Sequence, residues 1–143
     1  MVRIPVDIVY FAGGLRPMLK VVLRFDNPRI FLPVNAIIDT GSPTTLIGFS
    51  DLRRMRLSSL QIKKLLGKKE EINIGGGKMQ TVALEGMNFK VGNYLETSLD
   101  VKFPLSGEDE KQPTLLGVDF LEKIKANFYF NPDKRESYIE ILD

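Results

Sequence analysis

The sequence contains no histidine and no cysteine among its 143 residues. Their absence excludes Ser-His-Asp triads, Cys-His dyads, thiolate redox chemistry, HExxH metalloprotease sites and zinc sites of the usual Cys/His kind. Any proton transfer must therefore use Asp, Glu, Lys or Tyr side chains. We accordingly expect no metal site and no cofactor.

The sequence also lacks a strong excess of either charge, because 20 basic residues face 18 acidic ones and the net charge is +2. A balance this close does not predict a nucleic-acid partner. No segment reaches the length of a membrane span. The stretch Met1–Asp7 meets charge and proline before any apolar run develops, unlike a signal peptide. We therefore expect no nucleic-acid partner, no membrane partner and a cytoplasmic location.

Length and composition are typical of one soluble globular domain spanning residues 1–143, with 43% hydrophobic and 27% charged residues. Neither an internal repeat nor a linker divides it. Apolar alternation predicts a mainly β chain with one or two short helices. The predicted strands are Val6–Phe11, Met18–Phe25, Ile30–Ile38, Glu70–Ile74, Met79–Glu85, Met87–Val91, Leu95–Phe103, Thr114–Leu116, Ala126–Phe130 and Ser137–Leu142. Helical patterns follow Ser50, cover Leu60–Leu66 and begin near Val118.

Asp39 is the candidate working acid of the chain. It lies between two apolar runs that look buried, and an unpaired buried carboxylate must find hydrogen-bond donors or take up a proton. Thr40 offers a hydroxyl, and Gly41 permits a tight turn with backbone N–H groups directed at the carboxylate. The alternative is an ordinary Asp-Thr-Gly turn in a surface hairpin. The apolar residues on both sides favour the working acid.

The glycine-rich stretch between Ile74 and Met79 is the other conspicuous feature. A Walker loop would need Gly in place of Ile72 and Ser or Thr in place of Met79, and Gln80 breaks the dinucleotide-binding pattern. A glycine-tipped hairpin that moves and a surface turn without a role explain the sequence equally well.

Two segments carry a resemblance to a known family. The segment Ala36–Ser42 (Ala-Ile-Ile-Asp-Thr-Gly-Ser) resembles the active-site segment of the retropepsin-like aspartic proteases. The segment Leu115–Leu121 (Leu-Leu-Gly-Val-Asp-Phe-Leu) is similar to that family's later apolar-Gly-x-Asp/Asn-x-Leu segment. The order of the segments, with a glycine-rich hairpin between them and a helix after the second, also matches. In layout the resemblance covers roughly Ile4–Phe130.

This resemblance implies a closed, β-barrel-like acid protease fold with one lobe per chain. Asp39 would be the catalytic acid, and Thr40 would bond across the axis of a homodimer. Gly41 would bring its N–H close to the carboxylate, and Ser42 would add a further donor.

The resemblance also assigns supporting roles. Leu116 and Gly117 would underlie the Asp39 loop, whereas Asp119 would be structural, as its place at a helix start also indicates. The flap over the substrate would be formed by Ile74, Gly75, Gly76, Gly77, Lys78 and Met79.

The function implied is that of an aspartic endopeptidase, in which paired Asp39 carboxylates of two subunits activate a water molecule against a peptide or unfolded protein. The alternative is a non-catalytic peptide-binding or dimerisation module that retains the fold. The C-terminal strand Ser137–Leu142 either forms the dimer sheet or packs within one subunit, and the sequence leaves this open.

Overall fold

The computed structural model describes residues 1–57, 61, 69–74, 77–104 and 112–142. The predicted helix Leu60–Leu66 lies outside the described residues except for residue 61, and Gly75 and Gly76 lie outside them too. In the described ranges, no helix is both long enough and apolar enough to span a membrane.

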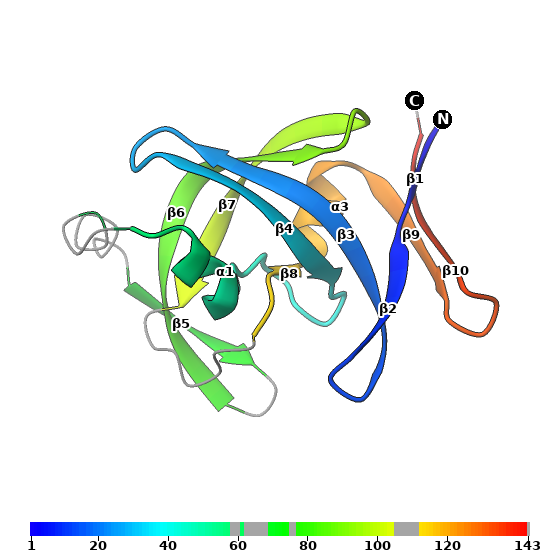
Figure 1. Cartoon of the computed structure of the whole chain (residues 1–143), viewed down its shortest axis with the longest axis horizontal. Helices are drawn as coiled ribbons and strands as arrows, with labels where there is room; N and C mark the ends of the chain where they lie inside the picture. The colour runs from blue at the N-terminus through cyan, green and yellow to red at the C-terminus, as the bar shows by residue number, and fades with distance from the viewer. Residues whose placement is uncertain (58–60, 62–68, 75–76, 105–111, 143) are drawn as a thin grey trace.

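Strands dominate the described chain, and two short helices accompany them (Figure 1). This confirms the prediction of a mainly β chain. The strands are β1 (Val2–Pro5), β2 (Asp7–Phe11), β3 (Gly14–Phe25), β4 (Ile30–Ile38), β5 (Lys69–Ile74), β6 (Gly77–Val91), β7 (Leu95–Pro104), β8 (Leu115–Leu116), β9 (Ala126–Asn131) and β10 (Glu136–Ile141). The helices are α1 (Phe49–Arg54) and α3 (Val118–Lys123).

The larger sheet of the described residues closes on itself. Its strands follow the order β5-β6-β3-β4-β8, with β2 paired to β3 and β7 paired to β6. Leu46 then forms one bridge to Leu115 in β8 and another to Lys102 in β7. The hydrogen-bonded path from β6 through β3, β4 and β8 therefore returns to β6 through β7, as the expected barrel-like form requires.

Alternation along β4 explains how this strand faces the core. Residues 30, 32, 34 and 36 are buried, and residues 31, 33 and 35 between them are exposed. Ile37 and Ile38 break the alternation because both are buried. There β4 is covered by two neighbours, since Ile37 pairs with Met18 in β3 and with Leu115 in β8. The core continues beneath the other strands, where the largest fully buried side chains include Leu23, Phe89, Phe103, Phe120 and Leu116.

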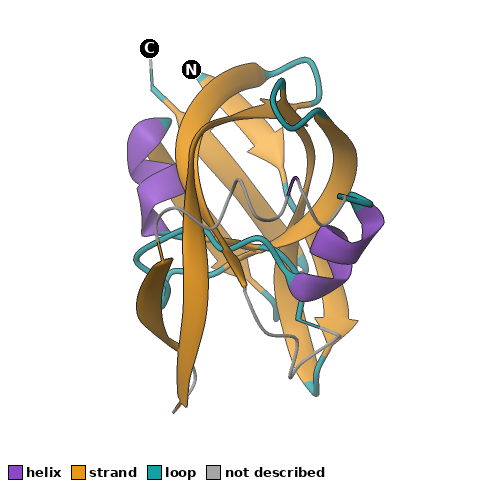
Figure 2. Ribbon diagram, turned by 90° about the vertical axis from the view of Figure 1, so that its left-hand side faces the viewer, coloured by secondary structure: helices purple, strands orange, loops and turns teal. Residues whose placement is uncertain are grey.

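The two helices lie on opposite sides of the strands (Figure 2). In α3, Phe120 is fully buried and its ring packs against Phe89 of β6 with 5.9 Å between centroids. This contact joins the helix to the larger sheet within the second sequence segment of interest, Leu115–Leu121.

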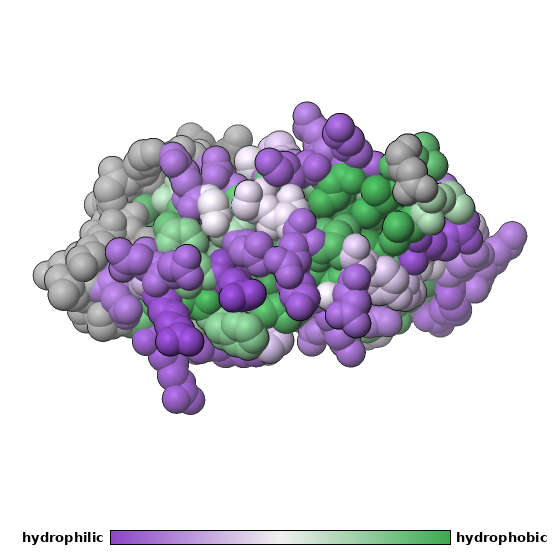
Figure 3. Space-filling model, turned by 90° about the horizontal axis from the view of Figure 1, so that it is seen from above, coloured by the Kyte–Doolittle hydropathy of each residue, from purple (hydrophilic) through white to green (hydrophobic). Residues whose placement is uncertain are grey.

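The smaller sheet answers the question about the C-terminal strand. β10 lies between β1 and β9 of the same chain, both antiparallel to it, so it packs within one subunit. The two termini consequently lie side by side (Figure 1). Figure 3 shows apolar surface on this end of the molecule. The exposed apolar residues in and next to the terminal strands include Met1, Val2 and Leu142.

Three strands differ from the prediction by more than one residue at a boundary, namely β6, β3 and β1. β6 is one strand of 15 residues, not two strands with a break at Gly86. A register shift between Leu84 and Met87 absorbs the irregularity, and Gly86 there has a positive φ of 77°. β3 begins at Gly14, where its first residues pair with β2. β1 was not predicted, because its only partner is the far C-terminal strand.

Candidate active site

Asp39 follows directly after the last residue of β4. Its backbone N–H donates to the Leu116 carbonyl oxygen at 2.9 Å, continuing the parallel pairing of Ile38 with Leu116. The side chain is half-buried, while Thr40 and Gly41 are exposed. The parallel pairing thus holds the carboxylate at the end of a buried strand and leaves its surroundings open.

The turn after Asp39 directs one backbone donor at the carboxylate. The Gly41 N–H donates to Asp39 Oδ1 at 2.9 Å, as the sequence predicted. A Cβ at position 41 would lie 3.2 Å from the same oxygen, so glycine allows this approach. The expected donation from Ser42 is absent in the described contacts, because its hydroxyl donates to the Thr44 carbonyl oxygen at 2.7 Å. The local Ser-x-Thr turn outcompetes the carboxylate for that hydroxyl.

Leu116 and Gly117 lie against this loop. A Cβ on Gly117 would lie 2.6 Å from the carbonyl carbon and oxygen of Thr44 and 2.7 Å from the Ser42 carbonyl oxygen. The next amide, of Val118, donates to the Ser42 carbonyl oxygen at 2.8 Å. Only glycine permits two backbone segments to approach this closely.

Asp119 braces the same loop from the first turn of α3. Its carboxylate accepts hydrogen bonds from the Thr45 N–H at 3.0 Å, the Thr45 hydroxyl at 2.8 Å and the Phe120 N–H at 2.8 Å. The Thr45 hydroxyl in turn accepts from the Gly117 N–H at 3.1 Å. Because these hydrogen bonds tie the Asp39 loop to α3, Asp119 has a structural role.

A second acid–threonine pair, which the sequence did not reveal, ties α1 to the start of β8. Asp51 is only 6% exposed, and its carboxylate accepts from the Thr114 hydroxyl at 2.8 Å and from Arg54 at 2.8 Å. Thr114 itself accepts from the Gly48 N–H at 3.0 Å. The sequence does show an acid in the first turn of the helix after Ser50, but the threonine that pairs with it lies 63 positions away.

Asp39 and Thr40 line a groove with a volume of about 940 Å³. Most of its wall is apolar, with Phe11 of β2 and the aromatic pair Phe128 and Phe130 of β9. The remaining lining residues are Ala12, Leu15, Arg16, Pro17, Ile37, Ile38, Gln112, Pro113 and Leu115. Sequence reasoning missed Arg16 and the β9 phenylalanines, because they approach Asp39 only through the fold.

The predicted flap region forms a hairpin, whose strands β5 and β6 project at the lower left of Figure 1. Ile74 pairs with Gly77, Asn73 with Lys78 and Ile72 with Met79 in antiparallel register. Gly75 and Gly76, which complete the predicted flap, lie outside the described residues.

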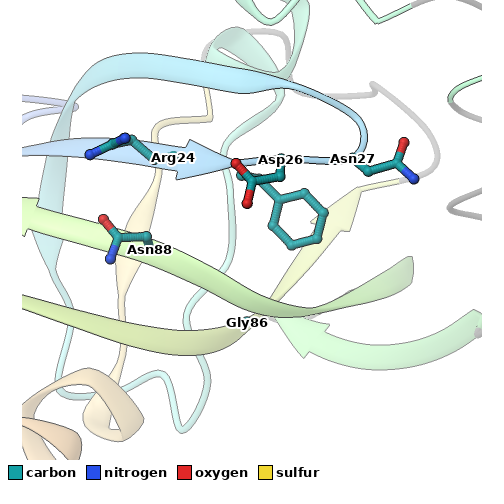
Figure 4. A pocket seen from close by; sticks show the side chains of 6 residues that line it. Arg24, Asp26, Asn27, Gly86 and Asn88 are labelled. Carbon is teal, nitrogen blue, oxygen red and sulfur yellow. The ribbon is translucent and has the colours of Figure 1, made fainter.

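A smaller hollow of about 430 Å³ shares no lining residue with the Asp39 groove. Figure 4 shows Arg24 of β3 beside Asn88 of β6, with Asp26 and Asn27 beyond the end of β3. The Asn88 Oδ1 atom is buried without a hydrogen-bond partner in the described part of the chain. The acid that lines this hollow, Asp26, is exposed, whereas Asp39 is half-buried at the end of a buried strand. We therefore place the candidate chemistry at Asp39. No group of three or more metal-ligating side chains occurs among the described residues.

The solved structures that are similar to this chain include two proteases. One is the EIAV protease in complex with the inhibitor HBY-793, at 20% identity and a TM-score of 0.55, with 85% of this chain and 100% of that chain covered. The other is a retropepsin-like aspartic protease from Rickettsia conorii, at 16% identity and a TM-score of 0.62, with 98% and 89% covered. No protein-family model and no curated protein matches the sequence.

The two matches cover 85% and 98% of this chain. The chain has a retropepsin-like fold. Within this retropepsin-like fold, Asp39 stands at the end of β4, Gly117 lies directly behind its loop, and the β5–β6 hairpin lies between the two segments in sequence.

Proposed function

We propose that this protein is an aspartic endopeptidase that acts as a homodimer. The observation that carries the proposal is the position of Asp39. A half-buried carboxylate, held by a glycine turn, lies in a large apolar groove of a retropepsin-like fold. The two similar structures reported above are described as proteases.

The chemistry requires two carboxylates. When two of them face each other, both cannot ionise, so the pair holds one proton between them. The ionised member takes a proton from a water molecule, and the protonated member donates to the scissile carbonyl oxygen. One Asp-Thr-Gly occurs in the sequence, so the second carboxylate must be Asp39 of another copy. Thr40, which neighbours Asp39 in the groove, would hold the two loops in register.

The geometry supports a contact through β9. β10 occupies one edge of β9, and no other strand of the described residues pairs with the opposite edge. Phe128 and Phe130 extend from β9 into the Asp39 groove. An edge strand that pairs with its own copy gives a two-fold interface, which would bring two Asp39 residues together.

The groove suits an extended peptide, whose backbone would add to strand edges while its side chains enter apolar pockets. The β5–β6 hairpin, with Ile74, Gly77, Lys78 and Met79, would cover the peptide as a flap together with Gly75 and Gly76. Leu116 and Gly117 would hold the Asp39 loop, and residues 1–143 would act as one domain. The cytoplasmic location stays a prediction.

The decisive variant is Asp39→Asn. The substitution keeps the side-chain shape and the acceptor for the Gly41 N–H but removes the acid. We expect the cleavage rate of denatured casein at mildly acid pH to fall by about 10²- to 10⁴-fold, the usual contribution of acid–base catalysis. Circular dichroism and sedimentation should show an unchanged fold and dimer.

Asp26→Asn is the matched control, because Asp26 is an exposed acid that does not line the Asp39 groove. It should cleave like the wild type. Equal cleavage by the Asp39→Asn variant, or no cleavage by the wild type, would favour a non-catalytic peptide-binding or dimerisation module.

A further inference from the structure

Arg16 is an exposed cation on the wall of an otherwise largely apolar groove. It lines the wall that also holds Asp39, together with Phe11, Leu15 and Phe128. The groove's described lining contains one other charged residue, Asp39 itself. Arg16 is exposed, so water and salt screen its charge, and a peptide covering the apolar wall would displace part of this water and strengthen the attraction to an acidic group.

The guanidinium group of Arg16 is oriented but largely unused. Its Nε–H donates to the Phe11 carbonyl oxygen at 3.4 Å, across the β2–β3 hairpin. Three ion pairs occur among the described residues, and none of them includes Arg16. The terminal N–H groups, which form the fork that matches a carboxylate, have no partner in the described residues. Because Arg16 is exposed, water can solvate these donors, and a peptide carboxylate would replace that water with charge-assisted hydrogen bonds.

We propose that Arg16 determines specificity by selecting an acidic side chain, Asp or Glu, of the peptide in the groove. This inference rests on the proposed function, because it assigns part of the substrate class to the same groove. The apolar wall takes the residues beside the cleaved bond, and Arg16 takes a carboxylate at one fixed position away from it. A bidentate Arg–carboxylate contact gives selectivity of about tenfold over the neutral amide, or about 1.4 kcal/mol.

The first experiment maps cleavage of denatured casein and serum albumin by mass spectrometry. For the wild type we expect Asp and Glu to be enriched at one fixed position relative to the cleaved bond. Arg16→Gln should lose this enrichment, and Arg16→Glu should replace it with Lys and Arg. Lys20→Gln is the control, since Lys20 is an exposed cation on the same strand that does not line the groove.

The second experiment uses two synthetic peptides that differ only in Glu or Gln at the mapped position. The wild type should prefer the Glu peptide about tenfold in kcat/KM, mainly through KM, and the preference should shrink at high salt. Equal ratios for the wild type and Arg16→Gln would overturn the assignment. Loss of the dimer in Arg16→Glu without any acid preference in the wild type would also overturn it, because the charge would then serve the subunit contact.

A binding experiment tests the role of Arg16 separately from the proposed peptidase activity. If the wild type does not cleave, binding of a fluorescent apolar peptide with one Glu, and of its Gln counterpart, is measured by polarisation. Tighter binding of the Glu peptide that Arg16→Gln abolishes would support the role of Arg16 in a module without turnover. Equal binding of the two peptides would reject it.

Discussion

At the scale of single residues, close backbone approach decides which side chains the site tolerates. Gly117 has carbonyl groups of Thr44 and Ser42 where a Cβ would stand, whereas Gly41 has only the Asp39 carboxylate nearby. The two glycines therefore have different functions. Gly117 allows the segments to meet, and Gly41 brings a donor to the acid.

Gly117→Ala should destabilise the fold strongly. The added methyl would stand 2.6 Å from backbone atoms that cannot rotate away, so the two segments must separate. Overpacking of this kind costs about 1–3 kcal/mol, and the midpoint of urea unfolding should fall accordingly. Gly14→Ala is the control, because the only atom near its Cβ is the end of the Arg16 side chain at 4.0 Å. An unchanged midpoint for Gly117→Ala would show that the segments can part at little cost.

At the scale of elements, alternation predicted the strands whose pattern is regular and failed where partners are remote. Ile30–Ile38 has the predicted boundaries, because its buried and exposed residues alternate within the segment itself. Val2–Pro5 has too few residues for a pattern, and pairing with β10 makes it a strand. Gly86 suggested a break in β6, yet a bulge keeps the strand continuous.

The contact of α1 with β8 offers a test at this scale. Thr114→Val keeps the side-chain shape but removes the hydroxyl, leaving Asp51 with one donor fewer and the Gly48 N–H without its acceptor. We expect a loss of about 1–3 kcal/mol in unfolding free energy and faster amide exchange in Phe49–Arg54.

The control for this test is Thr44→Val, because the Thr44 hydroxyl makes no hydrogen bond in the structure's described part. It should change neither the unfolding free energy nor the exchange of α1. Equal exchange in both variants would mean that Arg54 alone holds Asp51 in place.

At the scale of the whole molecule, the proposed mechanism needs a second carboxylate, which another copy of the chain would supply. The small sheet pairs β10 with β1 and β9, and no strand of the described residues pairs with the other edge of β9. We therefore propose this edge, whose Phe128 and Phe130 line the Asp39 groove, as the surface that a second copy would meet. Activity should consequently depend on assembly. Wild-type cleavage per protomer should fall on dilution, in step with the dimer fraction seen in sedimentation.

Phe130→Glu should raise the protein concentration at which cleavage per protomer reaches its full value, because it places a charge in the apolar wall on β9. Tyr94→Glu is the control, since Tyr94 is 50% exposed in the turn between β6 and β7. Full activity per protomer at concentrations where only monomer sediments would contradict a shared site.

The sequence by itself determined the local chemistry. The absence of histidine and cysteine restricted proton transfer to a few residue types, and the apolar runs around Asp39 marked that acid. Only the tertiary structure decided which residues meet it. Asp119 braces Thr45 across 74 positions, while Arg16 and Phe128 reach the groove from separate strands. A pattern read over a few neighbours reports burial along one strand, whereas contacts between distant segments depend on how the barrel closes.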